Sequence, residues 1–118
     1  MLFRSAVSVT GGTTIYISGQ VSQDAAGNVV GEGNLLAQTR QVYRNLGIAL
    51  SAAGATFADV VKLNVYVVGY QSEHRALLQS VREGHVSKDH PPASTLIGVQ
   101  ALARPEYLVE IEAIAVIT

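Results

Sequence analysis

The sequence predicts an α+β fold in which one mixed sheet carries two helices on one face, within a single domain spanning residues 1–118. Apolar and polar residues alternate along 60–68 and 107–117, which is the period of a strand. Along 35–53 apolar residues instead recur at three- and four-residue steps, which marks the buried stripe of a helix. Glycine-rich turns separate these segments, and the predicted element order is β-β-α-β-α-β-β.

The first half of the chain contributes two strands and the longer helix. Residues 3–9 and 14–21 form the strands, and the turn at 10–13 contains two glycines that accept positive φ. Gly19 lies inside the second strand, where a glycine weakens the strand unless it marks a bulge or a close approach by a backbone or ligand. Asn34 is the expected N-cap of the helix, and Gly54 ends it.

The second half contributes the remaining three strands and the shorter helix. The run 60–68 is rich in β-branched residues and is expected at the centre of the sheet, after a capping-box spacing from Thr56 to Asp59. A second helix is expected from about residue 72 to 83. Two strands follow, within 90–99 and 107–117, joined by a turn at 103–106.

Composition indicates that the chain associates with copies of itself. Of its 118 residues 48% are hydrophobic and only 14% are charged, which is a large apolar content for a chain of this size. The sheet face without helices carries Tyr16, Tyr66, Val68 and Ile114, and it requires a cover. Other subunits are the expected cover.

Several functional classes are disfavoured by composition. The net charge of −1 and the lack of a basic run argue against nucleic-acid binding. The chain has no cysteine, and its three histidines lack metal-site spacing, so no metal is expected. No cofactor fingerprint, signal-peptide layout or membrane-spanning run is seen, and we expect no cofactor, no membrane contact and a cytoplasmic location.

Glu112 is the first candidate for chemistry. It lies among apolar neighbours on a predicted inner strand, where a carboxylate is costly unless something satisfies it. It could act as a general acid/base, or it could pair with a lysine or arginine of a neighbouring subunit. Glu110 shares its face, and we expect it to be more exposed and structural.

The end of the chain resembles a known family. Residues 91–99, Pro-Pro-Ala-Ser-Thr-Leu-Ile-Gly-Val, and 108–115, Leu-Val-Glu-Ile-Glu-Ala-Ile-Ala, resemble the C-terminal signature of the Rid family, also called YjgF or RidA. That family contains small trimeric reactive-intermediate deaminases. The resemblance implies a chorismate-mutase-like fold, a homotrimer whose three sheets form a central barrel, and ligand clefts between subunits.

The resemblance also assigns site residues. Glu112 matches the catalytic cleft glutamate, and Ser18 and Gly19 match a ligand-binding Ser-Gly-Gln. Phe3 stands where RidA proteins have a cleft tyrosine, and Ser94, followed by Thr95, stands where they have the arginine that grips a carboxylate. Leu77 falls where they place an asparagine. Arg104 could restore the lost positive charge, although an arginine in such a turn more often has no role beyond the exposed surface of that turn.

Two functions follow from this resemblance. The first is a hydrolytic deaminase of an imine or enamine metabolite that is not held by an arginine–carboxylate clamp, and thus has little activity on 2-aminoacrylate. The alternative is a non-catalytic module that binds or senses a metabolite in the same cleft. Whether the protein is an enzyme stays open, and ribonuclease activity, which appears in the family's naming, is disfavoured by the charge.

Overall fold

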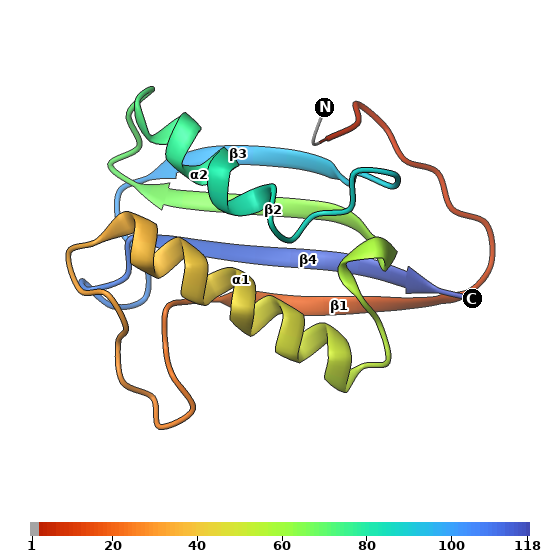
Figure 1. Ribbon diagram of the computed structural model, residues 1–118, viewed down its shortest axis with the longest axis horizontal. Coiled ribbons are helices and arrows are strands. Elements are labelled where there is room, and N and C mark those ends of the chain that lie inside the picture. Colours follow the sequence, from red (N-terminus) through yellow and green to blue (C-terminus); the bar gives the residue numbers. More distant parts are fainter. Residues whose placement is uncertain (1–2) are drawn as a thin grey trace.

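The computed structural model describes residues 3–118, which form a four-stranded sheet of order β1-β4-β2-β3 (Figure 1). β4 pairs antiparallel with β1 and β2, whereas β2 and β3 are parallel. The sheet is therefore mixed, and β2 is central, as predicted. The strands comprise β1 (Thr13–Gln20), β2 (Val60–Val68), β3 (Ala93–Val99) and β4 (Val109–Ile117).

Two helices, α1 (Leu35–Ala52) and α2 (His74–Arg82), cover one face of this sheet (Figure 1). The Asn34 side chain accepts a hydrogen bond from the Ala37 amide and caps α1, and Gly54 follows the helix with a φ of 82°. A short 3-10 turn, η1 (Phe57–Asp59), begins with the expected capping box of Thr56 and Asp59. The local signals at these ends are confirmed.

The core fills the space between the helices and the sheet. Alternate residues of β2 and β4 point into it, and α1 supplies the facing stripe. The members with no exposed surface include Leu46, Leu50, Leu63, Val67, Val109 and Ile111. This pattern confirms the fold class predicted from the sequence.

The N-terminal strand prediction was wrong. Residues 5–10 adopt no strand, and the segment makes a single bridge, from Arg4 to Ala93 at the start of β3. The Arg4 amide and Nε bind the carbonyls of Pro92 and Pro91, at 3.0 and 2.7 Å. The segment then runs around one end of the sheet to β1, at the opposite edge (Figure 1). A hairpin between 3–9 and 14–21 is thus excluded, because the first segment bridges to β3 at one edge of the sheet and the second forms β1 at the other edge.

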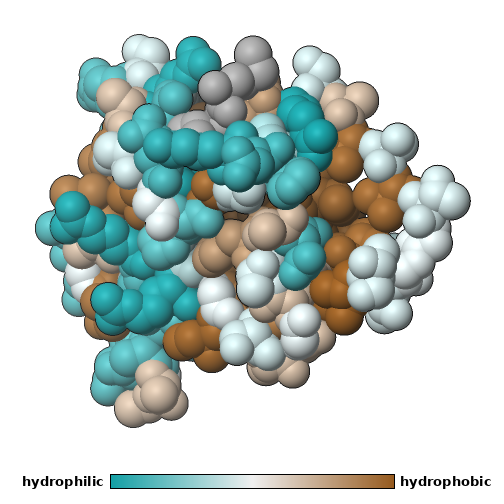
Figure 2. All heavy atoms as spheres, turned by 45° about the vertical axis from the view of Figure 1, so that its right-hand side comes forward, coloured by the Kyte–Doolittle hydropathy of each residue, from teal (hydrophilic) through white to brown (hydrophobic). Residues whose placement is uncertain are grey.

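The sheet face without helices carries apolar residues in contact with solvent. Tyr16 is 77% exposed and Ile97 42%, and Ile114 lies between them half-buried. Figure 2 shows a band of apolar residues at the surface in the right half of its view. Neither helix in the described part of the chain is long and apolar enough to cross a membrane.

Candidate functional site

Glu112 lies on the open face of the sheet and is held by the neighbouring strand. Its Oε1 accepts hydrogen bonds from Asn64 Nδ2 at 3.0 Å and from Tyr66 Oη at 2.6 Å. Asn64 is its cross-strand partner on β2, so this contact follows from the register. The hydrogen bond to Glu112 raises the pKa of the Tyr66 hydroxyl, and this hydroxyl therefore stays protonated and donates.

Glu110, two residues earlier on the same face, lies against Gly19 of β1. A methyl group added at Gly19 would lie 2.7 Å from Cδ and 2.9 Å from Cγ of Glu110. The pairing of β1 with β4 shifts between Ile17 and Gln20, so Gly19 lies at a bulge. Both explanations for a glycine at this position, a bulge and a close approach, are therefore present in the structure.

The pKa of the Glu110 carboxyl is raised above its ordinary value, first by burial and then by repulsion from Glu112. A raised pKa is what a carboxylate needs to exchange protons near neutral pH. Sequence reasoning gave Glu112 the chemical role and treated Glu110 as structural. The structure instead places the perturbed carboxyl at Glu110, beside the Ser18-Gly19 segment.

The opposite face of the sheet holds a cavity of about 620 Å³ between α2 and β3. Its walls are mostly apolar, and its described charged members are Arg75 and Arg82, both from α2. Phe3 and Ser94, two of the residues predicted for the cleft, line it. The other lining residues are Tyr43, Val65, Tyr70, Leu78, Gln79, Leu96 and Ile111.

Arg82 is the residue of this cavity that sequence reasoning missed. Its Nη1 donates to Ser94 Oγ at 2.9 Å, so its guanidinium lies beside the serine hydroxyl. Burial lowers the pKa of this guanidinium, although it stays a cation at any physiological pH. A sequence signal was available, because Arg75, Leu78 and Arg82 are spaced three and four apart and share one face of α2.

Tyr43 of α1 is buried and lines the same cavity. Burial raises the pKa of its hydroxyl to about 12, and the positive charge of Arg82 acts in the opposite direction. The hydroxyl is therefore protonated at neutral pH and available as a donor.

Thr95 lies away from the cavity. It pairs with Asn64 in the parallel register of β2 and β3, so it faces the open side of the sheet. Its Oγ1 accepts a hydrogen bond from Lys62 Nζ at 2.8 Å.

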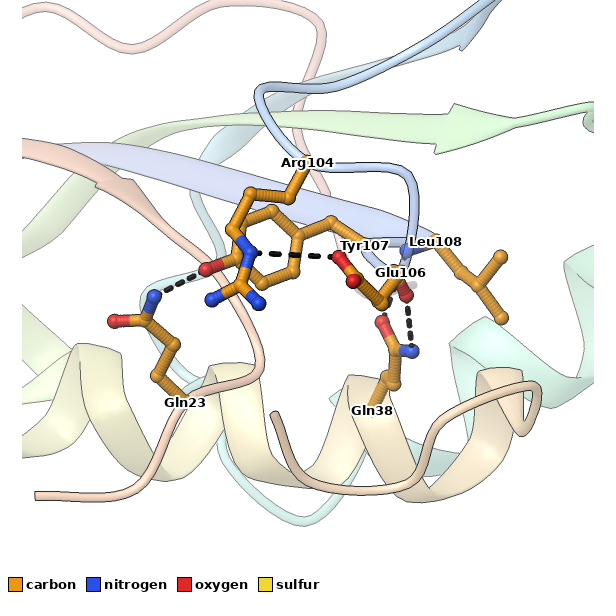
Figure 3. Close-up of polar contacts among 6 residues, drawn as sticks. All are labelled: Gln23, Gln38, Arg104, Glu106, Tyr107 and Leu108. Carbon is orange, nitrogen blue, oxygen red and sulfur yellow. Dashed lines mark hydrogen bonds and ion pairs between the residues drawn. The ribbon is translucent and has the colours of Figure 1, made fainter. Parts of the chain in front are cut away.

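Arg104 is also remote, since it follows the end of β3 whereas Ser94 lies near its start. The strand between them is roughly 16 Å long at about 3.3 Å per residue. Arg104 Nε pairs with Glu106 Oε2 at 3.4 Å, and the guanidinium carbon lies 5.5 Å from the centre of the Tyr107 ring (Figure 3). Arg104 thus belongs to the loop before β4 and does not line the cavity.

Two glutamines fix the same loop (Figure 3). Gln38 Nε2 donates to the carbonyl of Glu106 at 2.8 Å, and its Oε1 accepts from the amide of Leu108 at 2.9 Å. Gln23 Nε2 donates to the hydroxyl of Tyr107. Buried Gln38 therefore anchors the start of β4, the strand that presents both glutamates.

The predicted site residues are thus divided between two faces of one sheet. Phe3 and Ser94 line the cavity on the helix side, whereas Gly19, Thr95 and Glu112 lie on the open side. Glu110, which was not a predicted site residue, joins them there. Within residues 3–118 no group of three histidine or acidic side chains is placed to hold a metal ion. The arrangement has a carboxyl with a raised pKa on one face and an apolar cavity with two arginines on the other.

Comparison with known proteins links this arrangement to one family. A family model described as endoribonuclease L-PSP matches residues 3–117. A Rid-family protein of unknown function from Yersinia pestis is 46% identical, with 98% of this chain and 87% of that chain covered and a TM-score of 0.89. RidA from an Antarctic Psychrobacter is 35% identical over 96% and 86% of the two chains, with a TM-score of 0.79. A 2-iminobutanoate/2-iminopropanoate deaminase from Dermatophagoides farinae is 31% identical over 98% of this chain and 85% of its own.

Proposed function

The chain belongs to the Rid family, whose model is described as endoribonuclease L-PSP, and from that premise we propose that it hydrolyses a small imine or enamine metabolite in clefts between the subunits of a homotrimer. Relatives named as imine deaminases support the reaction class. In such a reaction water adds to the carbon of the C=N bond, the nitrogen gains protons, and the C–N bond breaks to give a carbonyl compound and ammonia. The protein must supply a group that takes a proton from water and returns it to nitrogen.

The observation that carries this proposal is the half-buried carboxyl of Glu110, with its raised pKa, beside Gly19. We assign proton transfer to Glu110 rather than to Glu112. Glu112 is already engaged, because its Oε1 accepts hydrogen bonds from Asn64 and Tyr66. Its role in the proposal is to keep the pKa of Glu110 high and to orient water.

The division of the site between two sheet faces supports a cleft shared by two subunits. One chain cannot bring Glu110 and the cavity to one ligand, because the sheet lies between them. A second copy can, if its open face carries the glutamates to the mouth of the first chain's cavity. The exposed Tyr16 and Ile97 on that open face are the apolar surface that such packing would cover.

The test is a coupled assay for hydrolysis of freshly generated 2-iminobutanoate, in which Glu110→Gln is compared with Glu112→Gln. Glu110→Gln should lower kcat about 100-fold or more, since general acid–base catalysis contributes on that order. Glu112→Gln should cost roughly tenfold, because it changes the environment of the proton-transfer group and not the group itself. Glu32→Gln, an exposed loop change, is the matched control.

Full activity in Glu110→Gln would overturn the assignment. Ligand binding with no turnover in the unmodified protein would favour the alternative, a binding module that uses the same cleft.

A further inference from the structure

We propose that Arg82 and Ser94 form an anion-binding subsite, which takes the carboxylate of a small ligand whose apolar body fills the cavity between α2 and β3. The proposal rests on the proposed function in one respect, namely that this cavity is one half of the same cleft. It assigns the positive charge of the site to a helix, whereas the resemblance implies a strand arginine, at the position of Ser94.

The first support is an unbalanced charge. The described charged residues that line the cavity are Arg75 and Arg82, in a chain whose net charge is −1. Within residues 3–118 no carboxylate is recorded in an ion pair with Arg82. A largely buried guanidinium without a counter-ion is unfavourable, and an anion from outside the chain would supply that counter-ion.

The second support is the arrangement of the donors. Arg82 Nη1 is used by Ser94, whereas Nε and Nη2 are buried and have no hydrogen-bond partner within residues 3–118. Nε and Nη2 form the side-on fork with which arginine binds both oxygens of a carboxylate. Ser94 accepts from Arg82, and its own hydroxyl proton is therefore free to donate as a third contact.

The third support is the surroundings of the fork. Nε and Nη2 are shielded from water, and a charge-assisted hydrogen bond is strongest in a dry environment. The proposal requires the guanidinium to turn toward the cavity, which the Arg82 side chain lines, when the ligand enters. The remaining walls are supplied by Phe3, Leu78 and Leu96, which suit a short apolar chain, and the hydroxyl of Tyr43 adds a neutral donor. These features select a small carboxylic acid over a phosphorylated or strongly polar ligand.

The experiment compares butyrate with butyramide, which has the same shape and no charge, by NMR titration and thermal shift on the whole protein. Butyrate should shift the Arg82 Nε–H resonance and raise the Tm, and butyramide should do neither. Arg82→Gln should raise the Kd for butyrate about thirtyfold or more, which corresponds to roughly 2 kcal/mol for a lost buried charge pair. Arg82→Lys, which keeps the charge without the fork, should have a Kd for butyrate between those of the unmodified protein and Arg82→Gln.

The matched control is Arg40→Gln, an exposed charge change on α1, which should bind butyrate like the unmodified protein. Without ligand, Arg82→Gln should melt at the same temperature or higher, because it removes an uncompensated charge. This result would exclude simple misfolding as the cause of lost binding.

Unchanged butyrate affinity in Arg82→Gln would overturn the subsite. A drop in Tm together with dissociation of the oligomer would also overturn it, because Arg82 would then pair with a carboxylate of another subunit. The two proposals fail separately. Butyrate binding without imine hydrolysis rejects the enzymatic function and keeps the subsite, and hydrolysis unaffected by Arg82→Gln rejects the subsite alone.

Discussion

At the scale of single residues, the protonation of Glu110 depends on its neighbour on the same strand face. Side chains at alternate positions of β4 point the same way, so the two carboxylates are forced together on the open face. Glu112 accepts two hydrogen bonds, whereas Glu110 is packed on Gly19. Burial and repulsion from Glu112 raise the pKa of the Glu110 carboxyl. The raised pKa of the Glu110 carboxyl suits a group that exchanges protons.

The Glu110 carboxyl should therefore titrate above its ordinary value of 4.5 in a carbon-detected NMR experiment. In Glu112→Gln its pKa should fall but stay raised, because burial is the larger cause and remains. Since the folded-state pKa of Glu110 is raised, its ionisation lowers the free energy of unfolding as the pH rises through that pKa. Below the pKa that Glu110 has in the unfolded chain, this loss of stability is absent. An unchanged Glu110 pKa in Glu112→Gln, with Glu32→Gln as reference, would show that the two carboxyls are not coupled.

At the scale of elements, the sequence was informative wherever a local pattern determines the outcome. The alternation in 60–68 and 107–117 and the caps at Asn34 and Thr56 depend on nearby residues alone. These predictions are confirmed, although β4 begins two residues later, at Val109. The segment 3–9 was misplaced because alternation does not specify which edge strand a segment meets. The contact of Arg82 with Ser94 was missed because it depends on how α2 lies over the sheet, which no local pattern specifies.

The contact between α2 and β3 gives a prediction for Ser94→Arg. From the sequence alone this change should restore a carboxylate clamp and raise imine hydrolysis. With Arg82 Nη1 only 2.9 Å from Ser94 Oγ, a second guanidinium would instead be forced beside the first, without a carboxylate among the described lining residues. Like charges brought together in a buried site cost several kcal/mol, so the Tm should fall by roughly 8 °C or more.

Two further variants separate charge from size in that test. Ser94→Gln, which is long and neutral, should be tolerated better than Ser94→Arg. The exchange Ser94→Arg with Arg82→Ser should recover the lost stability, because it returns the pocket to one guanidinium. If Ser94→Arg were as stable as the unmodified protein and more active, Arg82 would lie outside the working site.

At the scale of the whole molecule, the sheet separates the cavity from the two glutamates, and in our proposal each face supplies half of a shared site. The helix side has a cavity lined by Arg75 and Arg82, and the open side carries Glu110 and Glu112. The chain has a hydrophobic core of its own, so in this proposal a second copy is needed to complete the site and not to fold the chain. The apolar content of the sequence predicted that the chain associates with copies of itself. Assembly through the open face would cover the exposed apolar surface and would bring the glutamates of one chain to the cavity of another.

Tyr16→Asp tests this assembly directly. In the single chain Tyr16 is 77% exposed, so a monomer should tolerate the change within about 0.5 kcal/mol. In a trimer that buries the open face, the same aspartate would be an unpaired charge in an apolar interface and should dissociate the subunits. Ile48→Asp is the matched control, since Ile48 is 63% exposed on α1, on the helix side of the sheet. Light scattering should give three times the chain mass for the unmodified protein and for Ile48→Asp, and the mass of one chain for Tyr16→Asp. A monomeric unmodified protein at micromolar concentration would contradict the trimer, and with it the shared cleft.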